Sequence, residues 1–246
     1  MNSAKQRGKK NASNNTAINT PNVASSFSQT KKLPQPTEGV REGQAWVDWG
    51  TDNLYPDWLN SLFYDSPYQS GIIRQKVFFV AGGGYNMEFG SPEAEQQFNA
   101  FVKGQPSDHG LNELIELNTT DGEIYNGLAI RGVYNRKGTL SFMEALDFDK
   151  IRTDAKETTY YYSDNWGSKK QDPDVTGFKE IKPYNPLSKD GEFLIYYKYP
   201  SKEYRAGKKK TDMGLYPKPY YSGGLKDIST DIEMSSYHFN EILNNF

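Results

Sequence analysis

The sequence contains no cysteine, which excludes disulfide bonds and every metal site built from thiolates. Only two histidines are present, His109 in a loop-like segment and His238 in an expected helix. The metalloprotease pattern HExxH, the nucleophile elbow of hydrolases and the phosphate-binding Walker A motif are all missing. The sequence therefore offers few groups for catalysis, and we identify no catalytic, cofactor-binding or metal-binding residue in it.

Long apolar runs are missing as well. The longest, residues 77–81, is far too short to cross a bilayer, and no apolar segment follows the basic N-terminus as it would in a secretory signal. These observations predict no membrane partner. The chain is polar, with a mean hydropathy of -0.83, but its 18 Tyr, 13 Phe and 4 Trp indicate that most of it folds around a core.

The net charge of -2 conceals an asymmetry. Residues 1–44 contain seven Lys/Arg and two Asp/Glu, a net +5, whereas the remainder contains 29 − 7 = 22 Lys/Arg and 31 − 2 = 29 Asp/Glu, a net -7. We expect residues 1–44, rich in Asn, Ser, Thr and Lys, to be a disordered basic tail before a folded domain at 45–246. Tight groove binding by the acidic domain would be disfavoured by the negative charge of DNA. The weak candidates for DNA contact are the basic residues Lys5, Arg7, Lys9, Lys10, Lys31 and Lys32.

Periodicity predicts an α+β fold with N-terminal helices, a mainly antiparallel β centre and a C-terminal amphipathic helix. Helical spacing and start signals favour helices at about 55–65, 67–80, 92–103 and 111–126, with Ser66 and Ser91 as N-terminal caps. A short strand is expected at 85–89. Near Gly127 the period changes from 3.6 to two residues, and Asn135 to Gly138 have the composition of a hairpin turn. Strands are expected through about residue 200, and the last helix places Ile228, Ile232 and Phe239 on one side.

Three consecutive glycines, Gly82, Gly83 and Gly84, follow an apolar run. A phosphate-binding loop follows a strand and opens a helix, so that free N–H groups point at the anion. Here the glycines follow a helix, the order is reversed, and position 87 of a G-x-G-x-x-G pattern is Met. The sequence therefore predicts a structural turn that ends the helix.

Two acidic pairs are weak candidates for metal ligands. Asp147 and Asp149 would share a face if they lay on a strand, but no third ligand stands at a fixed spacing nearby. Asp172 and Asp174 resemble part of a calcium loop that lacks its last acidic ligand. Tyrosine clusters at 160–162, 196–199 and 220–221 could stack single-stranded nucleic acid, although strand alternation allows at most half of each cluster to share a face. Tyrosines of this kind are more common in subunit contacts.

Two long segments resemble the portal proteins of tailed bacteriophages, particularly of phages that infect Bacteroidetes. They are WGTDNLYPDWLNSLFYDSPYQSGIIRQKVFFVAGGG and LYPKPYYSGGLKDISTDIEMSSYHFNEILNNF, and the resemblance runs in order from Trp46 to the end. The motif residues that we carry over as structural are Trp49, Tyr55, Pro56, Pro67, Lys76, Gly82, Gly83, Gly84, Tyr220, Tyr221, Glu233, Phe239 and Asn240.

The resemblance implies a portal subunit with a wing-like domain and no enzymatic activity or cofactor. Such subunits form a ring, usually of twelve, at one capsid vertex of the virion, after assembly in the host cytoplasm. Double-stranded DNA passes through the channel during packaging and ejection. The implied partners are the terminase large subunit, the major capsid and scaffold proteins, and head-completion or tail adaptor proteins. A like-charged channel would let DNA slide, which suits the acidic domain.

Portal proteins are typically about twice this length, and the last helix keeps its apolar period to Phe246 without a stop signal. We therefore expect a chain that is truncated before most of the stem and clip and that does not close into a stable ring by itself. Two other classes remain open from the residues alone. One is a metal-dependent nucleic-acid enzyme of a mobile element, and the other is a monomeric binding module that uses its aromatic residues.

Overall fold

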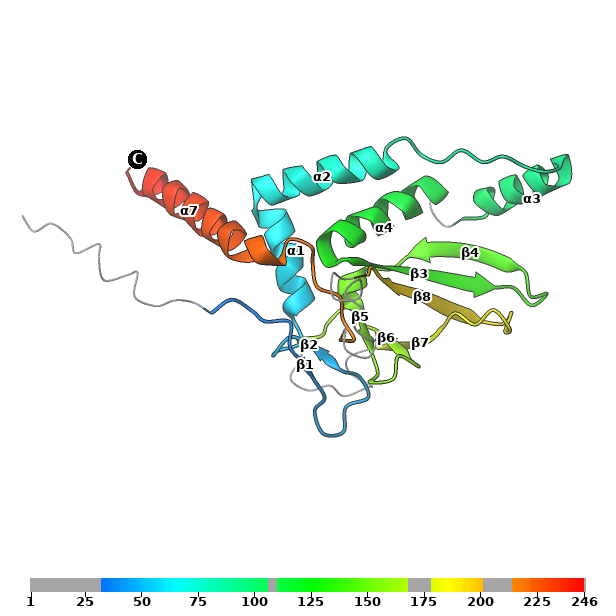
Figure 1. The fold of residues 1–246 in the computed structure, drawn as a ribbon, viewed down its shortest axis with the longest axis horizontal. Coiled ribbons are helices and arrows are strands. Elements are labelled where there is room, and N and C mark those ends of the chain that lie inside the picture. The colour runs from blue at the N-terminus through cyan, green and yellow to red at the C-terminus, as the bar shows by residue number, and fades with distance from the viewer. Residues whose placement is uncertain (1–31, 106–109, 168–177, 201–213, 246) are drawn as a thin grey trace, which may run out of the picture. The chain divides into compact units, whose positions relative to one another are not determined.

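The computed structural model describes residues 32–105, 110–167, 178–200 and 214–245 (Figure 1). The chain divides into two units, Met1–Leu33 and Pro34–Phe246. Nearly all of the first unit lies outside the described residues, and the described helices and strands all belong to the second. His109, Asp172, Asp174, Phe246 and all the DNA-contact candidates except Lys32 also lie outside the described residues.

The helices confirm the sequence expectation closely. They are α1 (Tyr55–Asp65), α2 (Pro67–Ala81), α3 (Pro92–Lys103), α4 (Leu111–Tyr125) and α7 (Leu225–Asn244). Two start as predicted, because the hydroxyl of Ser66 accepts a hydrogen bond from the Gln69 N–H and that of Ser91 accepts one from the Ala94 N–H. These caps satisfy donors that the first turn of a helix leaves free.

The β centre is a six-stranded sheet in the order β4-β3-β8-β7-β6-β5. Its strands are β3 (Gly127–Tyr134), β4 (Leu140–Ala145), β5 (Ile151–Thr153), β6 (Tyr160–Tyr162), β7 (Lys179–Pro183) and β8 (Glu192–Lys198). The change of period at Gly127 and the hairpin between β3 and β4 are confirmed, and the α+β class with them. Four of the five pairings are antiparallel, and only β7 and β8 pair in parallel, over two residues each.

Two local predictions differ from the structure. Residues 85–89 form no strand: their backbone is irregular and pairs with no other strand among the described residues. The rings of Tyr85 and Phe89 pack instead on Phe98 of α3, at centroid distances of 6.0 and 5.3 Å. Strand β1 (Glu38–Gly39) lies inside the segment 1–44 that was expected to be disordered. It pairs with β2 (Asp48–Trp49), just after that segment.

Glu38 explains why order begins this early. Its carboxylate accepts hydrogen bonds from the N–H groups of Leu215 (2.8 Å) and Tyr216 (3.1 Å), almost 180 positions later in the chain. Tyr216 in turn donates a hydrogen bond to the Val47 carbonyl. Contacts between such distant segments leave no mark in local composition, so the sequence did not predict them.

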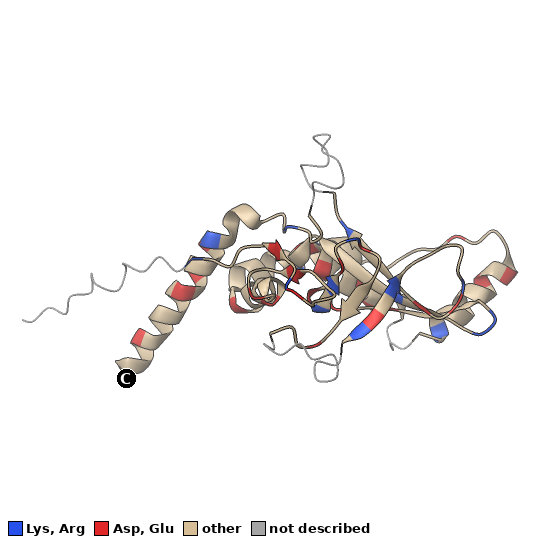
Figure 2. Cartoon of the chain, turned by 90° about the horizontal axis from the view of Figure 1, so that it is seen from below, with Lys and Arg blue, Asp and Glu red and all other residues tan. Residues whose placement is uncertain are grey.

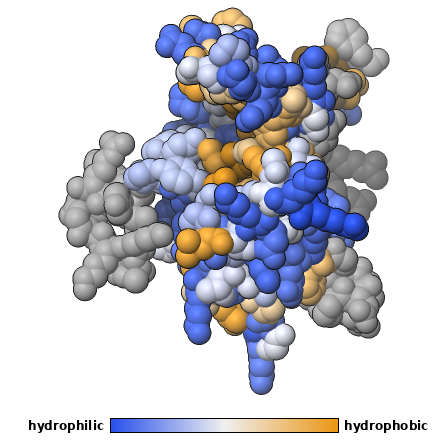
Figure 3. All heavy atoms as spheres, turned by 90° about the vertical axis from the view of Figure 1, so that its right-hand side faces the viewer, coloured by the Kyte–Doolittle hydropathy of each residue, from blue (hydrophilic) through white to orange (hydrophobic). Residues whose placement is uncertain are grey.

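The helices and the sheet are layered, with α2 packed on α4 and α4 packed on β3 and β4 (Figure 1). Trp49 lies at the centre of the core with no exposed surface. Its ring stacks on Tyr216 at 4.7 Å and meets Phe148 edge to face at 5.9 Å. The face shown in Figure 3 has several separate apolar patches, the largest near the middle, among mostly polar residues.

Candidate functional site

A buried arginine joins the segment around Trp49 to the sheet. Arg152 in β5 has no exposed surface. Its guanidinium donates to the side-chain oxygen of Asn53 (2.5 Å) and to the carbonyls of Asn53 (2.7 Å), Asp149 (2.6 Å) and Ile151 (2.9 Å). It also lies 5.0 Å from the ring centroid of Trp166 and 5.8 Å from that of Trp49. Burial lowers the pKa of Arg152 from its ordinary value, but the carbonyl oxygens solvate its charge.

Asn53 has the backbone geometry that this arrangement needs. Its φ of 64° is left-handed, a conformation that asparagine tolerates better than most residues. Its side-chain oxygen also accepts from the Trp49 N–H at 2.9 Å. Trp49, Asn53 and Arg152 therefore form a structural unit, and the sequence analysis did not single out Arg152 because a lone arginine in a strand carries no motif.

The residues carried over from the resemblance separate into two groups. Trp49, Tyr55 and Pro56 are buried, Pro67 begins α2, and Lys76 forms an ion pair with Glu123 at 2.7 Å between α2 and α4. Gly82 is the C-terminal cap of α2, Gly83 and Gly84 continue the turn, and the Tyr221 hydroxyl donates to the Ile124 carbonyl. Tyr220 and, on α7, Glu233, Phe239 and Asn240 are exposed and lie outside these helix starts, turns and core contacts.

The acidic pair Asp147 and Asp149 does not lie on a strand, the arrangement in which the two side chains would share a face. Asp147 precedes a 3₁₀ turn (Phe148–Lys150) that contains Asp149. Asp147 forms an ion pair with Lys150 at 2.7 Å, whereas burial, and then the charges of Asp147 and Asp57, raise the pKa of Asp149 to about 6. Within the described ranges, no group of three or more His, Asp or Glu side chains is placed to hold a metal ion.

A third carboxylate near this turn was missed by the sequence analysis. Asp121 of α4 accepts a hydrogen bond from the Phe148 N–H at 3.2 Å, and burial raises its pKa well above the ordinary value. It therefore helps to hold the turn against α4. Its signal was weak, because a single Asp in an amphipathic helix usually faces solvent.

The tyrosine clusters lie mostly in the core and do not form a stacking platform. Tyr160 and Tyr161 of β6 are buried, and Tyr196 of β8 stacks on Phe148 at 4.7 Å. Tyr197 and Tyr220 are exposed. His238 is exposed on α7, with its ring 5.8 Å from that of Tyr237.

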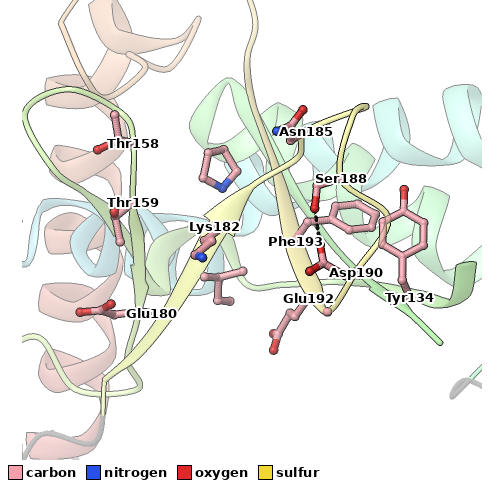
Figure 4. A pocket seen from close by; sticks show the side chains of 13 residues that line it. Tyr134, Thr158, Thr159, Glu180, Lys182, Asn185, Ser188, Asp190, Glu192 and Phe193 are labelled. Carbon is pink, nitrogen blue, oxygen red and sulfur yellow. Dashed lines mark hydrogen bonds between the residues drawn. The ribbon is translucent and has the colours of Figure 1, made fainter. Parts of the chain in front are cut away.

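A cavity of about 670 Å³ lies where β7 and β8 diverge (Figure 4). Phe193 and Tyr134 line one side, Thr158 and Thr159 come from the turn before β6, and Lys182 lies between them. Within the cavity Ser188 donates to Asp190. The residues that line the cavity include neither a histidine nor a cysteine, so the arrangement does not resemble a nucleophile with its base.

Apolar side chains cover both faces of α2. The inner stripe of Ile73, Val77 and Ala81 is buried, as is the polar Gln69 on the same side. Tyr68, Ile72 and Phe79 follow at a spacing of four and seven residues on the other side, and 75%, 56% and 75% of their respective surfaces are exposed. A helix that is apolar on both faces is usually enclosed by protein on both.

The apolar stripe of α7 continues beyond the part that packs on the domain. Leu225 is buried, and Ile228 and Ile232 pack against the core. Phe239 and Leu243 extend the same stripe at helical spacing, yet every residue from 233 to 245 is exposed. Across the described residues, every helix falls short of the length and apolar content that a bilayer-spanning helix needs.

No protein-family model and no curated protein matches the sequence. Among solved structures, a chain in the neck of an empty gene transfer agent (GTA) particle is similar at 16% identity and a TM-score of 0.35, over 53% of this chain and 37% of that one. A chain in the virion of a native GTA particle is similar at 14% identity and a TM-score of 0.36, over 65% of this chain and 40% of that one. The chain thus spans less than half of each, and TM-scores this low assign neither a family nor a function.

Proposed function

We propose that this chain is a structural subunit of a tailed-phage head–tail assembly, and that it is the wing-like part of a portal subunit that associates with copies of itself. The observation that carries the proposal is the apolar stripe of α7, which extends past the domain and is covered by no described residue. Exposed apolar side chains that lie side by side often mark protein–protein contacts. The ordered resemblance from Trp46 onward supports the portal assignment.

In this role the chain would be a component of the virion, assembled in the host cytoplasm, and would not be an enzyme. Its partners would be further portal subunits, the terminase large subunit, the capsid and scaffold proteins, and the head-completion or tail adaptor proteins. Double-stranded DNA would pass through the ring. The motif residues around Trp49 would serve to hold the fold, and those on α7 would serve in contacts.

Sedimentation velocity of the purified chain tests self-association. We expect species larger than a monomer at increasing concentration, and a monomer for the double variant Phe239→Glu/Leu243→Glu. Met234→Glu is the matched control, because Met234 is equally exposed on α7 but lies off the stripe. Circular dichroism checks that each variant is folded.

A wild-type chain that stays monomeric up to its solubility limit would contradict the proposal. EDTA-sensitive cleavage of nucleic acid would instead favour a metal-dependent enzyme. Tight binding of single strands or glycans by a monomer would favour a binding module.

A further inference from the structure

We propose that Gln105 protects the outer edge of the sheet: its side-chain amide occupies β4 and prevents this strand from pairing with β4 of a second copy. This is an inhibitory contact within the folded chain, and it does not depend on the proposed function. Strand β4 is the first in the sheet order and lies beside β3 (Figure 1). The free side of an outer strand presents backbone groups that another strand can bind.

The register of the β3–β4 hairpin shows which backbone groups of β4 face outward. The N–H of Leu146 donates to the Ala129 carbonyl at 3.0 Å, and hydrogen-bonded pairs recur at every second residue of an antiparallel ladder. Met143 and Ala145 occupy the alternate positions. Their N–H and C=O groups therefore point away from β3, toward the outer side of the sheet.

One of these outward donors is bound by Gln105. The Met143 N–H donates to the side-chain oxygen of Gln105 at 2.9 Å, and the side-chain nitrogen of Gln105 donates to the Phe101 carbonyl at 2.7 Å. The amide is thus held at both ends, between the last turn of α3 and β4. In this position it offers β4 the acceptor that the backbone of a further strand would offer.

The composition of β4 favours pairing if its edge is open. Its sequence, LSFMEA, contains no proline and one charged residue, and that residue, Glu144, is already paired with Arg131 of β3. Short β-prone segments of low net charge are the ones that add to one another at exposed edges. The cations Arg136 and Lys137 lie in the hairpin turn before β4, the blue loop at the right of Figure 2, and not along the strand.

The two edges of the sheet are covered by different means. At the far edge, the Thr153 N–H of β5 donates to the Tyr216 hydroxyl at 3.1 Å, and the Thr153 carbonyl accepts from the Val47 N–H at 2.9 Å, so core residues close that edge. Helix α3, by contrast, buries none of its residues. Its connection to β4 through Gln105 gives the helix a role that core packing does not explain.

Gln105→Ala tests the proposal, because it removes the acceptor and leaves α3 itself unchanged. The test uses the Phe239→Glu/Leu243→Glu background, so that contacts through α7 do not contribute. The Met143 amide, followed by NMR hydrogen exchange, should exchange about three- to tenfold faster once its hydrogen bond is lost. Sedimentation velocity should show dimers at rising concentration, because two β4 edges can pair antiparallel about a two-fold axis.

Adding Met143→Pro should return the Gln105→Ala chain to a monomer, because proline has no N–H to offer a second strand and this N–H takes no part in the β3 ladder. Gln96→Ala is the matched control: Gln96 is an exposed glutamine of α3, and its loss should change neither exchange nor mass. Circular dichroism verifies that each variant is folded. A Gln105→Ala chain that stays monomeric, with or without faster exchange, would overturn the protective role. Dimers that persist with Met143→Pro would overturn it as well.

Discussion

Replacing Arg152 by Met should destabilise the domain by about 3 kcal/mol, because it removes a buried cation and leaves its acceptors without a donor. Methionine retains an unbranched stem of similar length, so the cavity left behind is small. The guanidinium makes four hydrogen bonds, to Asn53 twice and to the carbonyls of Asp149 and Ile151.

The magnitude follows from two opposing effects. Hydrogen bonds that involve a charged group contribute about 1.5–3 kcal/mol each, so a simple sum over four would reach roughly 6–12 kcal/mol. The sum overstates the loss, because Met no longer incurs the cost of taking a cation out of water. Buried charged networks that lose one member typically lose about 3–5 kcal/mol, and the neutral partners here favour the lower end. At about 2–4 °C per kcal/mol for a chain of this size, Tm should fall by roughly 6–12 °C.

Urea unfolding followed by tryptophan fluorescence measures the change, since the rings of Trp166 and Trp49 lie within 5.8 Å of the guanidinium carbon. Asn53→Gly keeps the left-handed backbone while removing the shared acceptor, so a double-mutant cycle with Arg152→Met should show a coupling of at least about 1 kcal/mol. Arg131→Met is the control. Arg131 pairs with Glu144 and Glu192 at a partly exposed site, and its loss should cost only about 1 kcal/mol. A loss below about 1 kcal/mol at Arg152, or additive effects in the cycle, would refute the reasoning.

Three further predictions concern titration, packing and the tail. Burial raises the pKa of Asp149 from 3.8 to about 6, so the ionisation of this carboxyl lowers the stability of the folded state as the pH rises from about 4 to about 6. Asp149→Asn should therefore unfold at a higher urea concentration than the wild type above pH 6. Below pH 4 the two proteins should unfold at the same urea concentration. Equal midpoints throughout would show that this carboxylate is solvated. Gly132→Ala should lower the free energy of unfolding by about 1–3 kcal/mol, because the new Cβ would lie 2.2 Å from the Phe193 ring. In α2, by contrast, the Cβ of Gly71→Ala meets nothing within 4 Å, and this substitution should raise the free energy of unfolding by up to about 1 kcal/mol. Thermal or urea unfolding measures both. Similar effects of the two would contradict this packing. Residues 1–31 contain five Lys/Arg and no acidic residue. Deleting them should remove any salt-sensitive binding to duplex DNA in a filter or anisotropy assay, and should leave the unfolding midpoint unchanged. Binding that survives the deletion would place the DNA contact elsewhere.

Local chemistry in the sequence determined most of the secondary structure. Ser66 followed by Pro67, and Ser91 followed by Pro92, are capping signals that act within one helical turn, and both helices begin where these signals stand. The glycines after Ala81 end α2, as the order of elements predicted. The hairpin turn before β4 depends on a few adjacent residues, and it too forms as predicted. The resemblance to portal proteins also came from the sequence, and the function it implies stays a proposal.

Tertiary structure alone decided which polar groups are buried and which apolar faces stay exposed. Arg152, which is buried, and Asp121, which is half-buried, look like ordinary surface residues in sequence, because their partners lie 99 and 27 positions away. Both faces of α2 are apolar, so periodicity cannot say which one meets α4. The same period runs the length of α7, although in the described part of the chain only its first turns pack on the rest of the domain. Burial depends on contacts between distant segments, and a pattern of neighbouring residues does not contain that information.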